Sequence, residues 1–243
     1  MNEEIELTVV IPCYNEESNV VPLVEELTEV LEGLNRRYEI LYVDDGSTDS
    51  SVDRIRKVQA RRPKVRLVRH RMNSGESASE VTGFRHARGS TIITIDADLQ
   101  NDPRDIPILL EHLSEADVVC GVRRHREDDR VKRVSSKIAN GFRNIVTGDH
   151  VSDAGCTFRA LKREVTYDLP VFNGLHRFLP TLARYQGFTV AEVPVNHRPR
   201  QSGKSKYGIG NRMWRGILDC VVMRWFKHRC VTSRRVAEEN DCV

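Results

Sequence analysis

Two aspartates separated by one residue, Asp96 and Asp98, follow a run of β-branched residues in the sequence TIITIDADLQ. In an extended chain, alternate residues lie about 6–7 Å apart, and two carboxylates this close repel each other unless a cation lies beside them. Hard divalent cations such as Mg²⁺ or Mn²⁺ bind oxygen ligands and often share substrate phosphates. The pattern therefore predicts a metal site at Asp96 and Asp98, with Gln100 adding an oxygen on the same side if the chain stays extended.

Turn formation offers a structural interpretation of such acids. The D-x-D sequence precedes Asp102 and Pro103, which are typical of a helix start, so it could belong to a cap. A second acid pair, Asp44 and Asp45, opens the sequence DDGSTD at 44–49, where a turn and a helix cap account for the glycine and one acid. They do not account for both acids, and the second carboxylate suits a ribose hydroxyl or an N–H donor of a base.

Phosphate charge would be met by metal and basic side chains, because the sequence has neither G-x-G-x-x-G nor a Walker A motif. The candidates are Arg123, Arg133, Arg200 and Lys206. For any one of them taken alone, a solvated surface charge is the alternative interpretation.

The elements that must position these residues alternate between strands and helices. Apolar periodicity predicts strands at 7–13, 39–43, 65–69, 91–95, 117–121, 156–161 and 189–195, and helices at 18–33, 50–62, 77–88, 103–114, 134–146, 177–186 and 208–228. This order favours an α/β fold with a mostly parallel central sheet flanked by helices. Ligands of such sheets bind outside the carboxyl ends of the strands, and both acid pairs lie at such ends.

The composition narrows the class of protein. With 243 residues, 39% hydrophobic and 30% charged, the chain is typical of a soluble globular protein. No run approaches 18 apolar residues, and the acidic N-terminus is not typical of a signal peptide. The six cysteines form no C-x-x-C pair, which indicates reduced thiols in a cytosolic protein and no zinc site. We expect a catalytic domain at 1–207 and a basic segment at 208–243.

The C-terminal segment combines apolar residues with cations. Residues 196–235 contain eleven lysines and arginines but only one acid, Asp219. The apolar stripe of the expected helix consists of Ile209, Met213, Ile217, Val221 and Trp225, widened by Leu218, Val222 and Phe226. This arrangement suits a helix in a membrane interface, and packing on the domain core is the open alternative. Nucleic acid is not predicted as a partner, since no recognition motif is present.

Eight segments in a fixed order carry a resemblance to a known family. They are VVIPCYNEESNV (9–20), EILYVDDGSTDSS (39–51), NSGESASEVTGFRHARG (73–89), IDADLQNDP (95–103), VCGVRRHR (119–126), SDAGCTFRALKREV (152–165), GLHRFLPTLARYQGF (174–188) and EVPVNHRPRQSGKSKYG (192–208). Together they resemble the inverting family-two glycosyltransferases, which have the Rossmann-like GT-A fold. The similarity is greatest to the polyprenyl-phosphate branch, which includes dolichyl-phosphate mannose synthase and the undecaprenyl-phosphate sugar transferases.

The resemblance implies roles for site residues. The nucleotide would be bordered by Pro12, Tyr14 and Glu16, and its base or ribose would be contacted by Asp44 and especially by Asp45. The metal and diphosphate would be bordered by Asp96, Ala97, Asp98 and Gln100. Basic residues near acceptor or donor phosphates would be Arg123, Arg133, Arg200 and Lys206, the last two in a loop that closes over the donor. Asp153 matches an active-site acid, with the role of a base.

The implied reaction moves a hexose from a UDP- or GDP-sugar to a polyprenyl phosphate, dolichyl or undecaprenyl, at the cytoplasmic face of a membrane. A phosphate acceptor is largely ionised near neutral pH, so it needs cancellation of charge more than a base. Many members continue into transmembrane helices, whereas this sequence ends in the polar stretch VTSRRVAEENDCV. Peripheral attachment by the C-terminal helix, a membrane-anchoring partner protein and a soluble acceptor all stay open.

Two alternative functions follow from the same residues. One is a soluble family-two transferase that acts on a saccharide or glycoprotein. The other is a non-catalytic subunit that binds nucleotide sugars. Retention of Asp45, Asp96, Asp98, Arg200 and Lys206 argues against the second, because a protein without turnover has no need for all five.

Overall fold

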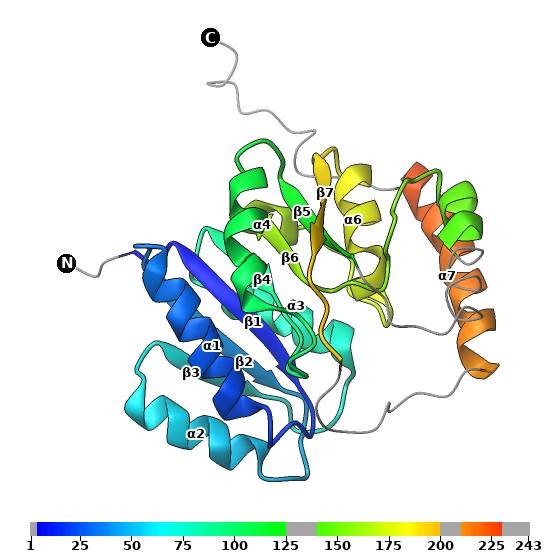
Figure 1. Cartoon of the computed structure of the whole chain (residues 1–243). Helices are drawn as coiled ribbons and strands as arrows, with labels where there is room; N and C mark the ends of the chain where they lie inside the picture. The colour runs from blue at the N-terminus through cyan, green and yellow to red at the C-terminus, as the bar shows by residue number, and fades with distance from the viewer. Residues whose placement is uncertain (1–3, 125–139, 200–209, 230–243) are drawn as a thin grey trace, which may run out of the picture.

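A computed structural model describes residues 4–124, 140–199 and 210–229, with only the backbone described for 210–215. Within these residues, seven strands form one sheet in the order β3-β2-β1-β4-β6-β5-β7 (Figure 1). The strands are β1 (Leu7–Cys13), β2 (Tyr38–Asp44), β3 (Val65–Arg69), β4 (Thr91–Thr94), β5 (Val118–Arg123), β6 (Arg159–Lys162) and β7 (Val190–Val195). All pairings are parallel except those of β6, which runs antiparallel between β4 and β5.

Helices cover both faces of the sheet (Figure 1). They are α1 (Val20–Gly33), α2 (Ser51–Arg61), α3 (Glu76–His86), α4 (Ile106–His112), α6 (Leu175–Tyr185) and α7 (Gly210–Arg229), with 3₁₀ turns η1 (Pro103–Asp105) and η2 (Arg163–Thr166). Residues 140–147 are also helical. One core cluster joins α1, α2 and α4 to the sheet, and a second joins α3, α6 and α7 to the opposite face.

The alternation of side chains along β1 explains why both faces carry a core. Val9 and Ile11 belong to one cluster and Val10 to the other, as expected for a strand whose neighbouring residues point to opposite faces. On the face of Val10, α3 approaches closely at Gly83, where an added Cβ would lie 2.2 Å from Val10 Cγ1. The absence of a side chain at Gly83 therefore sets how near α3 lies to the sheet.

The α/β class and the mostly parallel sheet are confirmed, with shifts at several element ends. The strand expected at 156–161 begins only at Arg159, and the helix expected at 103–114 starts as η1 and ends at His112. Of the helix expected at 134–146, residues 140–147 are described and helical, and 125–139 lie outside the described part. The boundary expected at 207 also lies outside it.

Candidate functional site

Two loops at the carboxyl ends of β1 and β2 are joined by hydrogen bonds. Asn15 has a φ of 54°, which asparagine tolerates better than most residues. Its side-chain Oδ1 accepts a hydrogen bond from the Thr48 amide at 2.8 Å, and its backbone amide donates to Ser47 Oγ at 2.9 Å. The Glu16 amide donates to Ser51 Oγ at 2.8 Å. Half-buried Tyr14 and Glu16 therefore stand in a preformed loop, and Pro12 lies just before it in β1.

The two acids at the end of β2 have different partners. Asp45 accepts from the amides of Ser74 and Gly75, at 2.9 and 2.8 Å, and lies 2.7 Å from His70 Nδ1. Its carboxylate thus holds the loop that leads into α3. The sequence had emphasised Asp45 as the contact to base or ribose, and this carboxylate already has three protein partners.

Asp44 keeps one acceptor without a partner. Its Oδ2 lies 3.3 Å from Arg69 Nε and accepts from the Ser47 amide at 3.2 Å. Its Oδ1 is buried and has no hydrogen-bond partner among the described residues. Since buried polar atoms are rarely left unpaired, Asp44 Oδ1 is the acceptor on this edge that a ligand could satisfy.

The D-x-D segment turns immediately after β4, so the expectation of an extended chain is wrong. Leu99 has a φ of 62°, and Asp98 Oδ1 accepts from the Gln100 amide at 3.1 Å. Both oxygens of Asp96 lie 2.7 Å from Thr157 Oγ1, which donates to them. Ala97 between the two acids is buried. The turn interpretation describes the backbone correctly, yet both carboxylates remain together at the end of β4.

Four carboxyl groups, those of Asp96, Asp98, Glu76 and Glu80, lie close together at this end of the sheet, and burial raises the pKa of three of them. Burial first, and then the Asp98 charge, raise the pKa of Asp96 to about 6. Burial likewise raises the pKa of Glu80 on α3 to about 7, where Arg159 opposes the shift and Asp96 adds to it. The pKa of Glu76 is also raised, by burial and by Asp96. Carboxyl groups that destabilise each other's charge in this way fit a bound cation, which would reverse the shifts.

The carboxylates do not form a complete metal cage by themselves. Across the described residues, no group of three or more His, Cys, Asp or Glu side chains converges as a metal site. A divalent cation that shares its coordination with substrate phosphates needs only one or two carboxylates. Asp96 and Asp98 fit a cation of that kind.

Gln100 connects the D-x-D segment to the chain that precedes the basic loop. Its carbonyl accepts from the Arg198 amide at 2.7 Å, and its Nε2 donates to the Arg198 carbonyl at 3.3 Å. The Arg198 guanidinium lies 2.7 Å from Glu26 and 2.6 Å from Asp102. The segment before residue 200 is therefore fixed beside the acids. Arg200 and Lys206 themselves lie outside the described residues.

Arg123 and Asp153, expected to act on phosphate and as a base, are paired with each other. Nε and Nη2 of Arg123 donate to the two Asp153 oxygens at 2.7 and 2.8 Å. Both side chains are largely buried, with 16% and 6% exposed. A carboxylate bound in this bidentate way orients the guanidinium. Arg133 lies outside the described residues.

Sequence reasoning missed several polar residues around Asp96. Thr157 and Arg159 come from the segment that enters β6, and Arg159 is fully buried with Nε and Nη1 unpartnered among the described residues. His176 Nδ1 lies 2.7 Å from Ser77 Oγ at the start of α3. The spacing of Glu76 and Glu80, four residues apart on a helix, could have indicated one shared face.

Comparisons with known proteins agree with this geometry. The family model described as Glycosyl transferase family 2 matches residues 8–169. The chain is 35% identical to dodecaprenyl-phosphate galacturonate synthase of Rhizobium johnstonii over 92% of its length and 68% of the relative. It is 37% identical to undecaprenyl-phosphate 4-deoxy-4-formamido-L-arabinose transferase of Edwardsiella ictaluri over 84% of its length and 63% of the relative. The chain thus spans about two thirds of these relatives.

A solved structure shares the fold. Glucosyl-3-phosphoglycerate synthase from Mycobacterium tuberculosis, in complex with Mn²⁺, UDP and glucosyl-3-phosphoglycerate, superposes with a TM-score of 0.68. The match covers 94% of this chain and 82% of that chain at 17% identity. The arrangement of the elements is therefore the one found in that synthase.

Proposed function

This chain belongs to glycosyl transferase family 2, and we propose that it transfers a hexose from a UDP- or GDP-sugar to a polyprenyl phosphate, with inversion and with help from a divalent cation. The observation that carries the proposal is the acid pair at the carboxyl end of β4, where Asp96 is half-buried and Asp98 is buried, with the carboxyl groups of Glu76 and Glu80 nearby. Support for the acceptor comes from the two relatives, which are named for dodecaprenyl and undecaprenyl phosphates.

Asp96 and Asp98 would hold Mg²⁺ or Mn²⁺, and Gln100 would contribute at the edge of the same site. When bound, the cation would neutralise the diphosphate leaving group as a Lewis acid. Thr157 orients Asp96 for this role by its hydroxyl hydrogen bonds. The structure of the related synthase contains Mn²⁺ together with UDP, which supports a metal of this kind.

The nucleotide would lie along the loops after β1 and β2, beside Pro12, Tyr14 and Glu16. Asp44 Oδ1 would accept a hydrogen bond from base or ribose, because it is the unpaired acceptor there. Asp45 would act through the loop at 70–75 that it holds.

Cations would screen the approach of the acceptor phosphate to the donor. Arg123, oriented by Asp153, stands at the end of β5, and we assign it to a phosphate together with Arg133. Arg200 and Lys206 would close over the donor from the loop that starts beside Gln100. An ionised phosphate attacks the anomeric carbon without a strong base, so charge screening is the main contribution of these side chains. The paired state of Asp153 argues against its role as a free base.

The reaction would take place at the cytoplasmic face of a membrane, because a polyprenyl chain resides in lipid. None of the described helices is long and apolar enough to cross a bilayer. We assign attachment to α7 in the lipid interface, with an anchoring partner protein as the alternative.

A transfer assay tests the proposal. Purified protein is incubated with Mn²⁺, each common UDP- and GDP-sugar in labelled form, and undecaprenyl or dolichyl phosphate in detergent. We expect one donor to give a lipid-linked sugar and the chelator to abolish the product. Transfer to a soluble saccharide without transfer to lipid would reject the acceptor, and nucleotide binding without turnover would indicate a non-catalytic subunit.

A further inference from the structure

Large apolar side chains are exposed on two helices. On α7 the exposed fractions are 63% for Leu218, 54% for Val221 and 61% for Trp225, and Val222 between them is 53% exposed. On the helical segment 140–147, Phe142 is 44% and Ile145 79% exposed. Figure 1 shows this segment beside the upper part of α7, on the far side of α6 from the sheet. Clustered exposed apolar side chains of this size are typical of an interaction surface.

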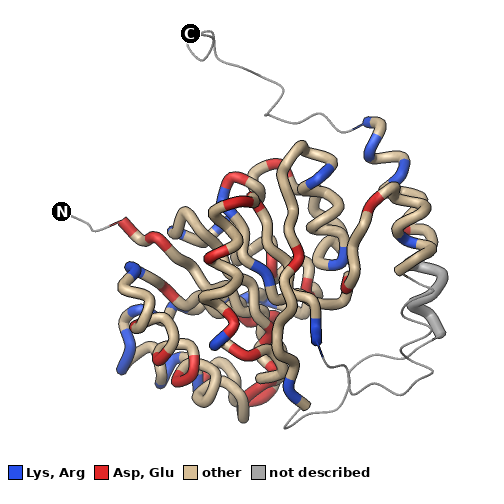
Figure 2. Tube along the Cα trace, turned by 45° about the horizontal axis from the view of Figure 1, so that its top comes forward, with Lys and Arg blue, Asp and Glu red and all other residues tan. Residues whose placement is uncertain are grey.

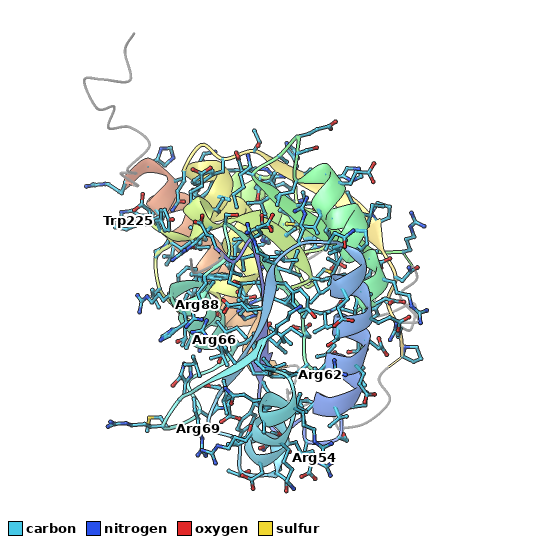
Figure 3. The ribbon with its side chains drawn as sticks, turned by 90° about the vertical axis from the view of Figure 1, so that its left-hand side faces the viewer. Arg54, Arg62, Arg66, Arg69, Arg88 and Trp225 are labelled. Carbon is cyan, nitrogen blue, oxygen red and sulfur yellow. The ribbon has the colours of Figure 1, made fainter. Side chains whose placement is uncertain are left out.

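The opposite side of α7 is packed against the domain. Cys220 and Met223 are 4% and 2% exposed and belong to the core cluster that includes α6. Asp219 lies 3.4 Å from Arg177 of α6. The interpretation of a helix packed on the domain core is therefore confirmed for this face, and the membrane-interface interpretation stays a prediction for the exposed face. A helix held in this way presents its outer apolar side chains in a fixed orientation, and Figure 3 shows Trp225 at the outer margin of the molecule.

The segment 140–147 is tied to α7 and to α6. Arg224 of α7 donates from Nη1 to the carbonyl of Val146 at 3.2 Å. From the same segment, Arg143 donates to Thr181 Oγ1 of α6 at 2.5 Å. Asp149, just after the segment, accepts from Thr181 and pairs with Arg184 at 2.5 Å. The two helices that carry the exposed apolar residues are therefore held side by side.

Cations border this surface at the C-terminal end of α7 (Figure 2). Four exposed basic residues lie in its last turns, namely Arg224, Lys227, His228 and Arg229. Lys227 Nζ also lies 5.4 Å from the centre of the Tyr185 ring of α6, and the hydroxyl of Tyr185 donates to the carbonyl of Thr147 at 2.6 Å. Apolar side chains next to a group of cations match the acyl chains and the negative headgroups of an anionic bilayer.

We propose that α7 and residues 140–147 form one platform that binds the surface of an anionic bilayer, with Trp225 and Ile145 inserted among the lipids. The proposal rests on the proposed function only in that a lipid acceptor gives the platform its use. It goes beyond the expectation for the C-terminal helix, because it assigns an equal part to a segment about 75 residues earlier in the sequence. Charge complementarity selects a bilayer over a second copy of this chain, whose matching surface would carry the same cations.

Sedimentation with vesicles tests the platform. The wild-type chain should bind vesicles of phosphatidylcholine with phosphatidylglycerol more tightly than phosphatidylcholine alone, and added salt should weaken binding. Trp225→Glu and Ile145→Glu should each weaken binding by about tenfold or more, since a charge replaces inserted apolar surface. Tyr167→Glu is the matched control, because Tyr167 is 68% exposed after η2 and belongs to neither helix; it should bind as the wild type does.

Three outcomes would overturn the platform. If the wild type and both variants bind vesicles equally, neither helix binds the bilayer and the platform is rejected. If only Trp225→Glu weakens vesicle binding, the bilayer contact is limited to α7 and residues 140–147 have no part in it. A change from dimer to monomer in either variant, with vesicle binding intact, would assign the surface to a second copy. Circular dichroism of each variant shows whether it is folded, and the milder Trp225→Ser and Ile145→Ser replace any that is not.

Turnover separates this proposal from the proposed function. Transfer to a short, water-soluble prenyl phosphate without vesicles should be the same in the wild type, Trp225→Glu and Ile145→Glu. If the wild type transfers sugar but does not bind vesicles, the platform is rejected and the proposed function is not. Vesicle binding without transfer to any prenyl phosphate would reject the function alone.

Discussion

At the scale of single residues, the partners of each carboxylate decide what it can do. Asp45 is occupied by two backbone amides and His70, whereas Asp44 keeps a buried oxygen without a partner. The sequence placed both acids at the edge where nucleotide is expected. The resemblance emphasised Asp45, and the sequence could not reveal that other protein groups already bind this carboxylate, because the loop at 70–75 is distant in sequence and makes no motif with it.

We expect Asp45→Ala to lower the free energy of unfolding by about 1–3 kcal/mol, because it leaves two backbone amides without an acceptor. Asp44→Asn should keep the fold and weaken the binding of UDP or GDP, since the amide keeps one acceptor and loses the charge. Urea denaturation and calorimetric nucleotide titration measure the two effects. The assignment is wrong if Asp44→Asn binds nucleotide as the wild type does while Asp45→Ala is fully stable.

Thr157 is a residue whose effect on the metal can be measured directly. Its hydroxyl donates to Asp96, and groups that orient a metal ligand typically contribute about 10- to 100-fold in metal affinity. Thr157→Val should therefore weaken Mn²⁺ binding in the presence of UDP or GDP by about tenfold or more. Thr157→Ser keeps the hydroxyl and serves as the control. Equal Mn²⁺ affinities of all three proteins in a calorimetric titration would show that the hydrogen bond has no such role.

At the scale of elements, the sequence did not reveal that β6 is antiparallel, and this strand determines which residues surround Asp96. Apolar runs predicted the strands, and their alternation with helices predicted a mostly parallel sheet. The direction of β6 could not be predicted, since a buried strand of four residues has the same pattern either way. Its insertion between β4 and β5 brings Thr157 and Arg159 to Asp96, so the surroundings of the proposed metal site depend on this strand.

The start of β5 makes a testable contact with the segments that flank it. Asp117 accepts from Lys162 Nζ, from the Thr189 amide and from Thr189 Oγ1, each at 2.9 Å. Burial alone would raise the pKa of Asp117, but the hydrogen bonds from Lys162 and Thr189 outweigh it and lower the pKa to about 2. Asp117 joins the end of β6 to the start of β7.

A lowered pKa fixes the sign of the pH dependence. The ionised Asp117 contributes its full stabilisation above the pKa of the unfolded chain, about 4, and this is lost as the pH falls toward about 2. Asp117→Asn should therefore be less stable than the wild type by about 1–2 kcal/mol at pH 7. The difference should shrink between about pH 4 and 2. Denaturation curves across this range measure it, and a gap that does not change with pH would contradict the assignment.

At the scale of the whole molecule, acidic side chains lie together at the carboxyl end of the sheet strands. Elsewhere, α7 and residues 140–147 expose apolar side chains, with cations at the end of α7. Ordered motifs in the sequence indicated the fold and the D-x-D position. The amphipathic pattern of α7 indicated a membrane-interface helix or a packed helix, and the structure shows one face packed on the core and one face of exposed apolar side chains. The association of residues 140–147 with α6 and α7 could not be predicted, because it depends on contacts of Arg143 and Arg224 with elements distant in sequence.

The central claim is that Asp96 and Asp98 at the end of β4 hold a divalent cation together with the nucleotide. Calorimetric titration of UDP and of GDP, in Mn²⁺ and in chelator, tests it most directly when the wild type is compared with the double variant Asp96→Asn and Asp98→Asn. We expect one nucleotide to bind the wild type much more tightly in Mn²⁺ than in chelator, and the double variant to lose that difference. The same nucleotide affinity in chelator, or an unchanged response to Mn²⁺ in the double variant, would contradict the claim.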